Sequence, residues 1–133
     1  MSVILDTHVW LWWLLGQPDL PARERSALDT IALGEAPLLP AICLWEAQML
    51  HAKGRLTLTL PFDRWLMEAA QSAVVRIAPL DVQVVLAIDD LPSSFHGDPA
   101  DRIIVATARA LTLPLATHDR RIRRCRLVKI WRP

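Results

Sequence analysis

Short apolar runs alternate with longer helix-like segments along the chain, and turn-forming or polar residues close each of them. Residues 2–5 form a brief apolar run that ends at Asp6. A continuous run of this kind is typical of a strand that is buried on both faces. The next segment, 8–15, is predicted to be a helix because Gly16 and then Pro18 follow it.

The same alternation continues to the C-terminus, with no repeat, linker or low-complexity tract. Further helices are predicted at 21–33, 41–52, 61–73, 81–88, 99–111 and 119–124. Further strands are predicted at 37–40, 74–77, 115–117 and 127–130, with a loop at 92–97. Helices that alternate with short apolar strands indicate a parallel sheet covered on both faces. We therefore expect a single domain over residues 1–133, of α/β class, built as a three-layer α/β/α fold with a central parallel sheet.

Composition is compatible with one packed domain, since 53% of the 133 residues are hydrophobic and 22% are charged. The formal net charge of +1 does not indicate a strongly basic nucleic-acid binder. Basic residues nevertheless gather in the segment 120–132, and such a local edge can bind phosphates. Cys43 and Cys125 have no metal-site spacing, so we expect two buried or half-buried thiols in a reducing cytoplasm.

The N-terminus does not resemble a signal peptide, because Asp6 interrupts its apolar run. The apolar run at 9–15 is far shorter than the roughly 20 residues that span a bilayer. We expect a cytoplasmic protein with no membrane partner.

Four acidic residues stand where a solvated charge is not expected. Asp6 and Asp119 directly follow predicted strands, and the strand ends of open parallel sheets line the crevice where ligands bind. Glu46 and Asp101 each lie on an apolar face of a predicted helix. The residues on those faces are Ile42, Met49 and Leu50 around the glutamate, and Ile104, Val105 and Ala108 around the aspartate.

Each acid also has a structural interpretation. Asp6 and Asp119 can cap the helices that follow them, and Glu46 can pair with an arginine. Asp98 fits the N-cap of the helix that begins at Pro99, with Asp101 as the acidic partner of a capping box. We favour the cap for Asp98 and a chemical role for the inward-facing Asp101.

Carboxylates that are brought close together repel one another, and their pKa values rise unless a cation neutralises them. Mg²⁺ or Mn²⁺ prefers such oxygen ligands. A bound ion of this kind activates water and stabilises charge on a phosphodiester. The four acids therefore indicate a metal-dependent phosphodiester hydrolase, with Asp6, Glu46, Asp101 and Asp119 as both metal ligands and catalytic residues.

Four motifs in sequence order resemble the PIN-domain family, and especially its branch of VapC-like ribonuclease toxins. They are VILDTHVWLWWL, AICLWEAQM, FHGDPADRIIVATAR and LATHDRRI, and the resemblance covers nearly the whole chain. It implies a Mg²⁺- or Mn²⁺-dependent endoribonuclease that is the toxin of a type II toxin–antitoxin pair. It further implies a homodimer, an RNA substrate and a cognate antitoxin that occludes the acidic site.

The resemblance also assigns positions. The four acids of the family fall on Asp6, Glu46, Asp101 and Asp119, and Thr117 takes the place of the hydroxyl residue that often precedes the fourth. Asp98 is typical of this branch, as a ligand or only as a cap. Ala41 departs from the family, since many relatives have Ser there, and His118 stands where Arg is common. Neither departure removes a carboxylate.

Several residues around the acids remain candidates for contacts. Arg102, Arg120 and Arg121 are possible RNA-backbone contacts. His96 and His118 can contact a phosphate or have surface or capping roles. Three tryptophans, at 10, 12 and 13, crowd one helix, so we expect one or two in the core and at least one in a dimer or antitoxin interface.

Three other functions remain open from the sequence. One is a catalytically silent PIN-like binding module, and another is a DNA-directed nuclease of the same superfamily. A phosphoacceptor signalling domain is disfavoured because Asp6 stands alone after its strand and Lys129 falls inside the last predicted strand. None of the four histidines forms a pair with the close spacing of a helical zinc site.

Overall fold

The structure, a computed structural model, describes residues 2–95 and 97–133. Within them a parallel sheet has the strand order β3-β2-β1-β4. Its strands are β1 (Ile4–Leu5), β2 (Leu38–Pro40), β3 (Arg76–Ala78) and β4 (Leu115–Ala116). The helices are α1 (Thr7–Leu15), α2 (Ala22–Leu33), α3 (Ile42–Ala52), α4 (Phe62–Ala69), α5 (Val82–Asp89), α6 (Pro99–Leu111) and α7 (Arg120–Cys125).

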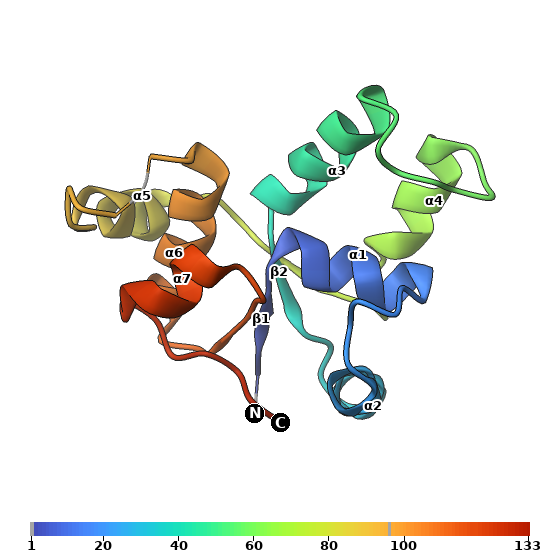
Figure 1. Ribbon diagram of the computed structural model, residues 1–133, viewed down its shortest axis with the longest axis horizontal. Helices are drawn as coiled ribbons and strands as arrows, with labels where there is room; N and C mark the ends of the chain where they lie inside the picture. The colour runs from blue at the N-terminus through green and yellow to red at the C-terminus, as the bar shows by residue number, and fades with distance from the viewer. Residues whose placement is uncertain (1, 96) are drawn as a thin grey trace.

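Helices cover both faces of this sheet. Figure 1 shows α1, α2 and α4 on one side of the strands and α5, α6 and α7 on the other, while α3 contacts both α1 and α6. Ile4 of β1, Leu39 of β2 and Leu115 of β4 are fully buried between the layers. This arrangement confirms the predicted three-layer α/β/α class with a central parallel sheet. No helix in the described part of the chain is long and apolar enough to cross a membrane.

The prediction of a final strand at 127–130 is wrong. Only Ile130 pairs with the sheet, through a single parallel bridge to Leu115. In this bridge the Leu115 N–H donates to the Lys129 carbonyl at 2.8 Å, and the Trp131 N–H donates to the Leu115 carbonyl at 2.9 Å. Because β4 spans only two residues, it offers the C-terminal segment too few backbone groups for a longer ladder.

The boundary between α4 and β3 also differs from the prediction. The helix ends at Ala69 instead of residue 73, and the strand begins at Arg76 instead of residue 74. The Arg76 guanidinium donates to the Ala36 carbonyl at 2.8 Å and to the Ser2 hydroxyl at 3.0 Å. The two partners precede Arg76 by 40 and 74 positions in the chain. No local pattern around residue 76 could therefore have placed the start of the strand.

The crowded tryptophans of α1 divide between the core and its edge. Trp10 is fully buried and donates from its indole nitrogen to the Ala69 carbonyl at 3.2 Å. Trp13 is also buried, and its indole nitrogen donates to Asp29 at 2.9 Å. The expectation that one or two of the three pack in the core is confirmed. The third, Trp12, is half-buried.

Both cysteines are free thiols, Cys43 buried and Cys125 half-buried, as expected.

Candidate functional site

The carboxyl ends of β1 and β4 meet at a cavity of about 210 Å³. The Asp6 N–H donates to the Ala116 carbonyl at 3.1 Å, so the residues that follow the two strands lie at the same edge of the sheet. The residues that line the cavity are Asp6, Thr7, His8, Glu46, Asp98, Asp101, Ile104, Asp119 and Arg121. The four acids predicted from separate segments therefore line one cavity, together with Asp98.

Asp6 both caps α1 and lies in the cavity. Its Oδ1 accepts a hydrogen bond from the Val9 N–H at 2.8 Å, which confirms the capping interpretation. The side chain is buried, and this burial raises the pKa of Asp6 above its ordinary value. Hydrogen bonds from Thr117 and Val9 oppose the rise, whereas the charge of Asp101 adds to it. The surroundings of the Asp6 carboxylate thus disfavour its ionised form.

Glu46 reaches the same cavity from α3. The Thr7 hydroxyl donates a hydrogen bond to its Oε1, so a neutral hydroxyl and not an arginine is bonded to this half-buried acid. Burial raises the pKa of Glu46, and the charges of Asp101 and Asp98 raise it further, while the bond from Thr7 lowers it. Sequence reasoning missed Thr7, although its position directly after Asp6 placed it at the same strand end.

The remaining acids sit at the starts of α6 and α7. Asp98 accepts a hydrogen bond from the Asp101 N–H at 3.0 Å, so it caps α6 as predicted and also lines the cavity. Asp119 accepts from the Ile122 N–H at 3.0 Å and caps α7. By contrast, Ala41 stands at the N-cap of α3 and provides no side-chain cap.

Thr117 connects two of the acids. Its buried hydroxyl accepts from the Asp119 N–H at 3.1 Å and also bonds to the Asp6 carboxylate. This geometry suits the supporting role predicted for it. His8 is a second lining residue that sequence reasoning missed, and its nearness lowers the pKa of both Asp6 and Glu46. The signal for His8 was again its place at the end of β1.

The predicted basic contacts separate in the structure. Arg121 lines the cavity, whereas Arg120 is exposed on α7 and lies outside the lining. Arg102 lies against Phe95, with its guanidinium 5.9 Å from the ring centroid and a hydrogen bond of 3.3 Å to the Phe95 carbonyl. The structure therefore brings only Arg121 of the three to the acids.

The two histidines proposed as phosphate contacts have different outcomes. The His118 ring nitrogen Nε2 lies 2.9 Å from both carboxylate oxygens of Glu24, so this side chain joins the end of β4 to α2. It does not line the acidic cavity. His96 lies outside the described residues.

The donor set of the cavity fits a hard divalent cation. Carboxylate oxygens are the ligands that Mg²⁺ and Mn²⁺ prefer, and burial has already removed part of the water that would stabilise Asp6 and Glu46 as anions. Over residues 2–95 and 97–133, no three His, Cys, Asp or Glu side chains form a ready metal cage. Mg²⁺ does not need one, because it usually keeps several waters and takes one or two carboxylates plus substrate phosphates.

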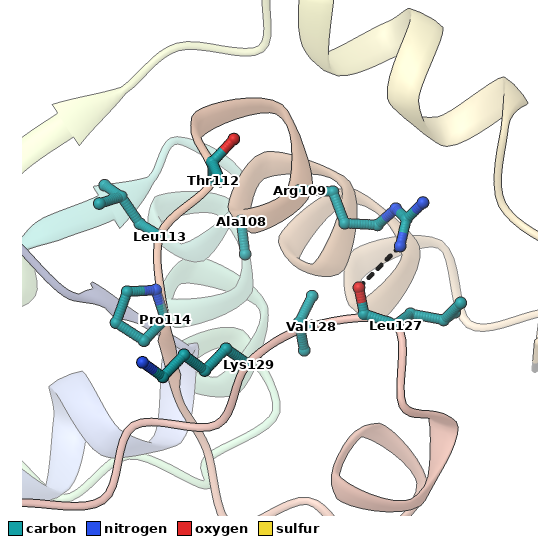
Figure 2. A pocket seen from close by; sticks show the side chains of 8 residues that line it. All are labelled: Ala108, Arg109, Thr112, Leu113, Pro114, Leu127, Val128 and Lys129. Atoms are coloured by element: carbon teal, nitrogen blue, oxygen red, sulfur yellow. Dashed lines mark hydrogen bonds between the residues drawn. The ribbon is translucent and has the colours of Figure 1, made fainter.

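A larger hollow of about 530 Å³ lies at the opposite end of β4, and Figure 2 shows its lining. Its walls are mainly apolar, from Leu113, Pro114 and Val128 among others. Arg109 donates to the Leu127 carbonyl at 2.7 Å across it. No acidic side chain is among the described residues that line it, so this hollow lacks the chemistry of the smaller cavity.

A parallel α/β/α fold with acids at the carboxyl ends of its strands defines the class of this protein. The model of the PIN domain family matches residues 3–127, so the chain belongs to that family. The chain is 35% identical over 133 residues to Ribonuclease VapC22 from Mycobacterium tuberculosis (strain ATCC 25618 / H37Rv), covering 98% of each protein.

Solved structures support the same fold. One is the crystal structure of VapBC2 from Rickettsia felis bound to a DNA fragment from their promoter, with a TM-score of 0.75 at 16% identity over 98% of each chain. Another is FitAcB from Neisseria gonorrhoeae, with a TM-score of 0.66 at 23% identity over 99% of this chain and 98% of that one. At these identities the two structures bear on the fold alone.

Proposed function

We propose that this protein is a divalent-metal-dependent endoribonuclease that hydrolyses RNA phosphodiester bonds. The observation that carries the proposal is the single cavity lined by Asp6, Glu46, Asp101 and Asp119. RNA is the favoured substrate because the relative with 35% identity is named a ribonuclease. We further propose that the chain is the toxin of a type II toxin–antitoxin pair in the cytoplasm, held silent by a cognate antitoxin.

The residues of the cavity have distinct roles in this proposal. Asp6 and Asp101 would hold Mg²⁺ or Mn²⁺, with Glu46 and Asp119 as further ligands of the ion or of its waters. When bound, such an ion supplies an activated water and neutralises charge on the phosphodiester. Thr117 orients Asp6 and Asp119 through its two hydrogen bonds, and Thr7 orients Glu46. Arg121 provides a positive charge in the same lining for a phosphate oxygen.

The assay that tests this function uses single-stranded and structured RNA with Mg²⁺, with Mn²⁺ or with EDTA. We expect cutting only with metal, and a loss of at least about 100-fold in Asp6→Asn and Asp101→Asn, because a lost ligand should cost no less than a lost outer-shell partner. Equal cutting by both variants would contradict the proposal. No cutting at all would favour a silent binding module, and cutting of DNA in place of RNA would favour a DNA-directed nuclease.

A homodimer is part of the same proposal. Its support is an apolar surface on α5 and the turn before it, where Leu80 is 49%, Val82 71%, Val85 51% and Leu86 58% exposed. Contiguous exposed apolar side chains mark interaction sites on soluble proteins. We expect sedimentation to show a dimer for the native chain and a monomer for Val85→Glu, with Gln83→Glu on the same helix as the control. A native chain that is monomeric at all concentrations would exclude this surface as a dimer interface.

A further inference from the structure

A third hollow, of about 380 Å³, lies between the start of α2 and the C-terminal segment. Arg23, Arg123 and Arg132 contribute three positive charges to its lining. Glu24 also lines it and lies 2.9 Å from the His118 ring nitrogen, and its single negative charge leaves the three arginines in excess. The hollow is therefore cationic, and its size lies within the roughly 300–1,000 Å³ of small-ligand sites.

The cationic hollow adjoins the acidic cavity through the chain itself. His118 lines the hollow, and the next residue, Asp119, lines the acidic cavity. Arg123 lines the hollow and donates from Nε to the Thr117 carbonyl at 2.7 Å, which ties it to the residue that positions Asp6 and Asp119. Consecutive residues of the chain thus line the hollow and the acidic cavity.

Aromatic rings connect the two places. The His8 ring lines the acidic cavity, and its centroid is 5.9 Å from that of Trp12. The Trp12 ring is in turn 5.8 Å from the ring of His118 in the cationic hollow. Trp131, which is half-buried, adds a further ring to the lining of the hollow. The surface from the acids to the hollow thus combines rings with arginines.

This combination is the recognition chemistry of single-stranded RNA. Bases that are not paired stack on aromatic side chains, and arginines bind the phosphates between them. An acidic protein segment is the other ligand that arginines and rings can bind. Consecutive residues of the chain line the hollow and the cavity in which RNA is proposed to be cut, and this favours RNA over a protein segment.

We propose that the cationic hollow is a nucleotide subsite for single-stranded RNA, with a base against Trp131 and neighbouring phosphates on Arg23 and Arg132. The strand runs from this subsite past His118 and Trp12 to the acidic cavity. The inference rests on the proposed ribonuclease function, since it names how the same substrate is held outside the reacting centre. It assigns substrate binding to residues at both ends of the chain, which no local motif brings together.

The first test measures RNA binding without cutting. The Asp101→Asn background, with Mg²⁺ present, is titrated with a fluorescently labelled single-stranded RNA of about 12 nucleotides, and anisotropy gives the affinity. We expect Arg23→Glu and Arg132→Glu, introduced together into the Asp101→Asn protein, to weaken RNA binding about tenfold or more. The slope of log affinity against log salt should fall by about 1.4, because each phosphate contact on a single strand contributes roughly 0.7.

The matched control is the pair Arg55→Glu and Arg64→Glu, which makes the same charge change at two exposed positions outside the cationic hollow and the acidic cavity. It should leave affinity within about twofold of the background, since only distant, screened charge is changed. If the pair and the control weaken binding equally, or if neither does, the subsite is excluded. An acidic peptide that binds the hollow while RNA affinity stays unchanged would also overturn the proposal.

The second test concerns the ring. Trp131→Leu should weaken binding about tenfold because it removes the stacking surface, whereas Trp131→Phe should restore most of the affinity. Thermal unfolding of both variants separates a binding defect from a folding defect, since Trp131 also packs at the edge of the core. Equal affinities of the folded Leu and Phe variants would exclude stacking. Because binding is read in a variant impaired in cutting, failure of the nuclease assay and failure of this subsite are distinguishable.

Discussion

The two ends of β4 carry two very different hollows. At its amino end lies the larger one, of about 530 Å³, with walls of Leu113, Pro114 and Val128 (Figure 2). At its carboxyl end lies a cavity of about 210 Å³ lined by five acids. The smaller cavity has the features of a reaction centre, so size alone does not identify the functional end of this sheet.

The two ends differ in whether their charged side chains are exposed or buried. At the amino end, Arg109 donates to a backbone carbonyl, and its ion pair with Asp90 is long, at 3.9 Å, with the Asp90 side chain 80% exposed. At the carboxyl end, burial raises the pKa of Asp6 and of Glu46, and the pKa of each rises further because of the charge on Asp101. Charge that is buried and mutually repelling costs stability, and a protein keeps such an arrangement where binding a cation compensates it.

The largest expected effect tests whether the two ends differ in chemistry. Glu46→Gln removes one carboxylate from the acidic cavity without changing its shape, and we expect RNA cutting to fall at least about 100-fold. Asp90→Asn makes the same chemical change beside Arg109 at the other end, and we expect cutting within about twofold of the native rate. Initial rates at saturating Mg²⁺ measure both. Similar losses in the two variants would remove the distinction between the ends.

A smaller effect tests whether the buried charge of Asp6 lowers the free energy of unfolding. The folded-state pKa of Asp6 is raised above 3.8, so the folded protein binds this proton more readily than the unfolded chain. The contribution of Asp6 to stability therefore falls as pH rises from the unfolded-state pKa through the raised folded-state pKa. Asp6→Asn keeps an N-cap of equal quality and removes the charge. We expect it to stabilise the metal-free protein at about pH 7 by about 1 kcal/mol.

Thermal unfolding in EDTA measures this gain, and it should shrink or reverse when Mg²⁺ is added. The control is Asp81→Asn, because Asp81 also caps a helix, accepting from the Val84 N–H at 3.0 Å, but is exposed. It should change stability by no more than a few tenths of a kcal/mol. A metal-free Asp6→Asn variant that is less stable than the native chain would show that the charge of Asp6 does not destabilise the fold.

The smallest expected effect concerns the hydroxyl that holds Glu46. Thr7→Val removes the hydrogen bond that lowers the pKa of Glu46, so that pKa should rise further. The acid limb of the pH–activity profile should then move to higher pH, while activity at alkaline pH stays within about fivefold, the value of one hydrogen bond of about 1 kcal/mol. Thr107→Val is the control, since its hydroxyl donates within α6 to the Ile103 carbonyl. A profile that does not move would exclude this role for Thr7.

Much of the fold and of the site could be predicted because the signals were local. Gly16 and Gly54 end or follow helices with φ of +64° and +70°, where a residue without a side chain is favoured. Asp6, Asp81, Asp98 and Asp119 cap the helices that follow them, which fixes where four helices begin. The same positions put three of these acids at the cavity.

What could not be predicted depends on contacts between distant segments. The pairing of His118 with Glu24 joins residues 94 positions apart, and nothing near His118 distinguishes it from a histidine free to bind phosphate. The segment 127–130 has the apolar pattern of a strand, but its pairing is limited by the shortness of β4. Arg102 neighbours Asp101 in sequence, yet the Phe95 loop holds its side chain away from the cavity lining.

The sequence alone determined the alternation of strands and helices, the helix starts and the four acids, because apolar periodicity and capping act over a few residues. Only the tertiary structure decided which side chains share a surface. It added Thr7 and His8 to the acidic cavity, and it placed Arg23 from α2 beside Trp131 and Arg132 from the C-terminal segment. The physical reason is that burial and the repulsion between charges depend on distance in space, which the sheet sets by joining strand ends that are far apart along the chain.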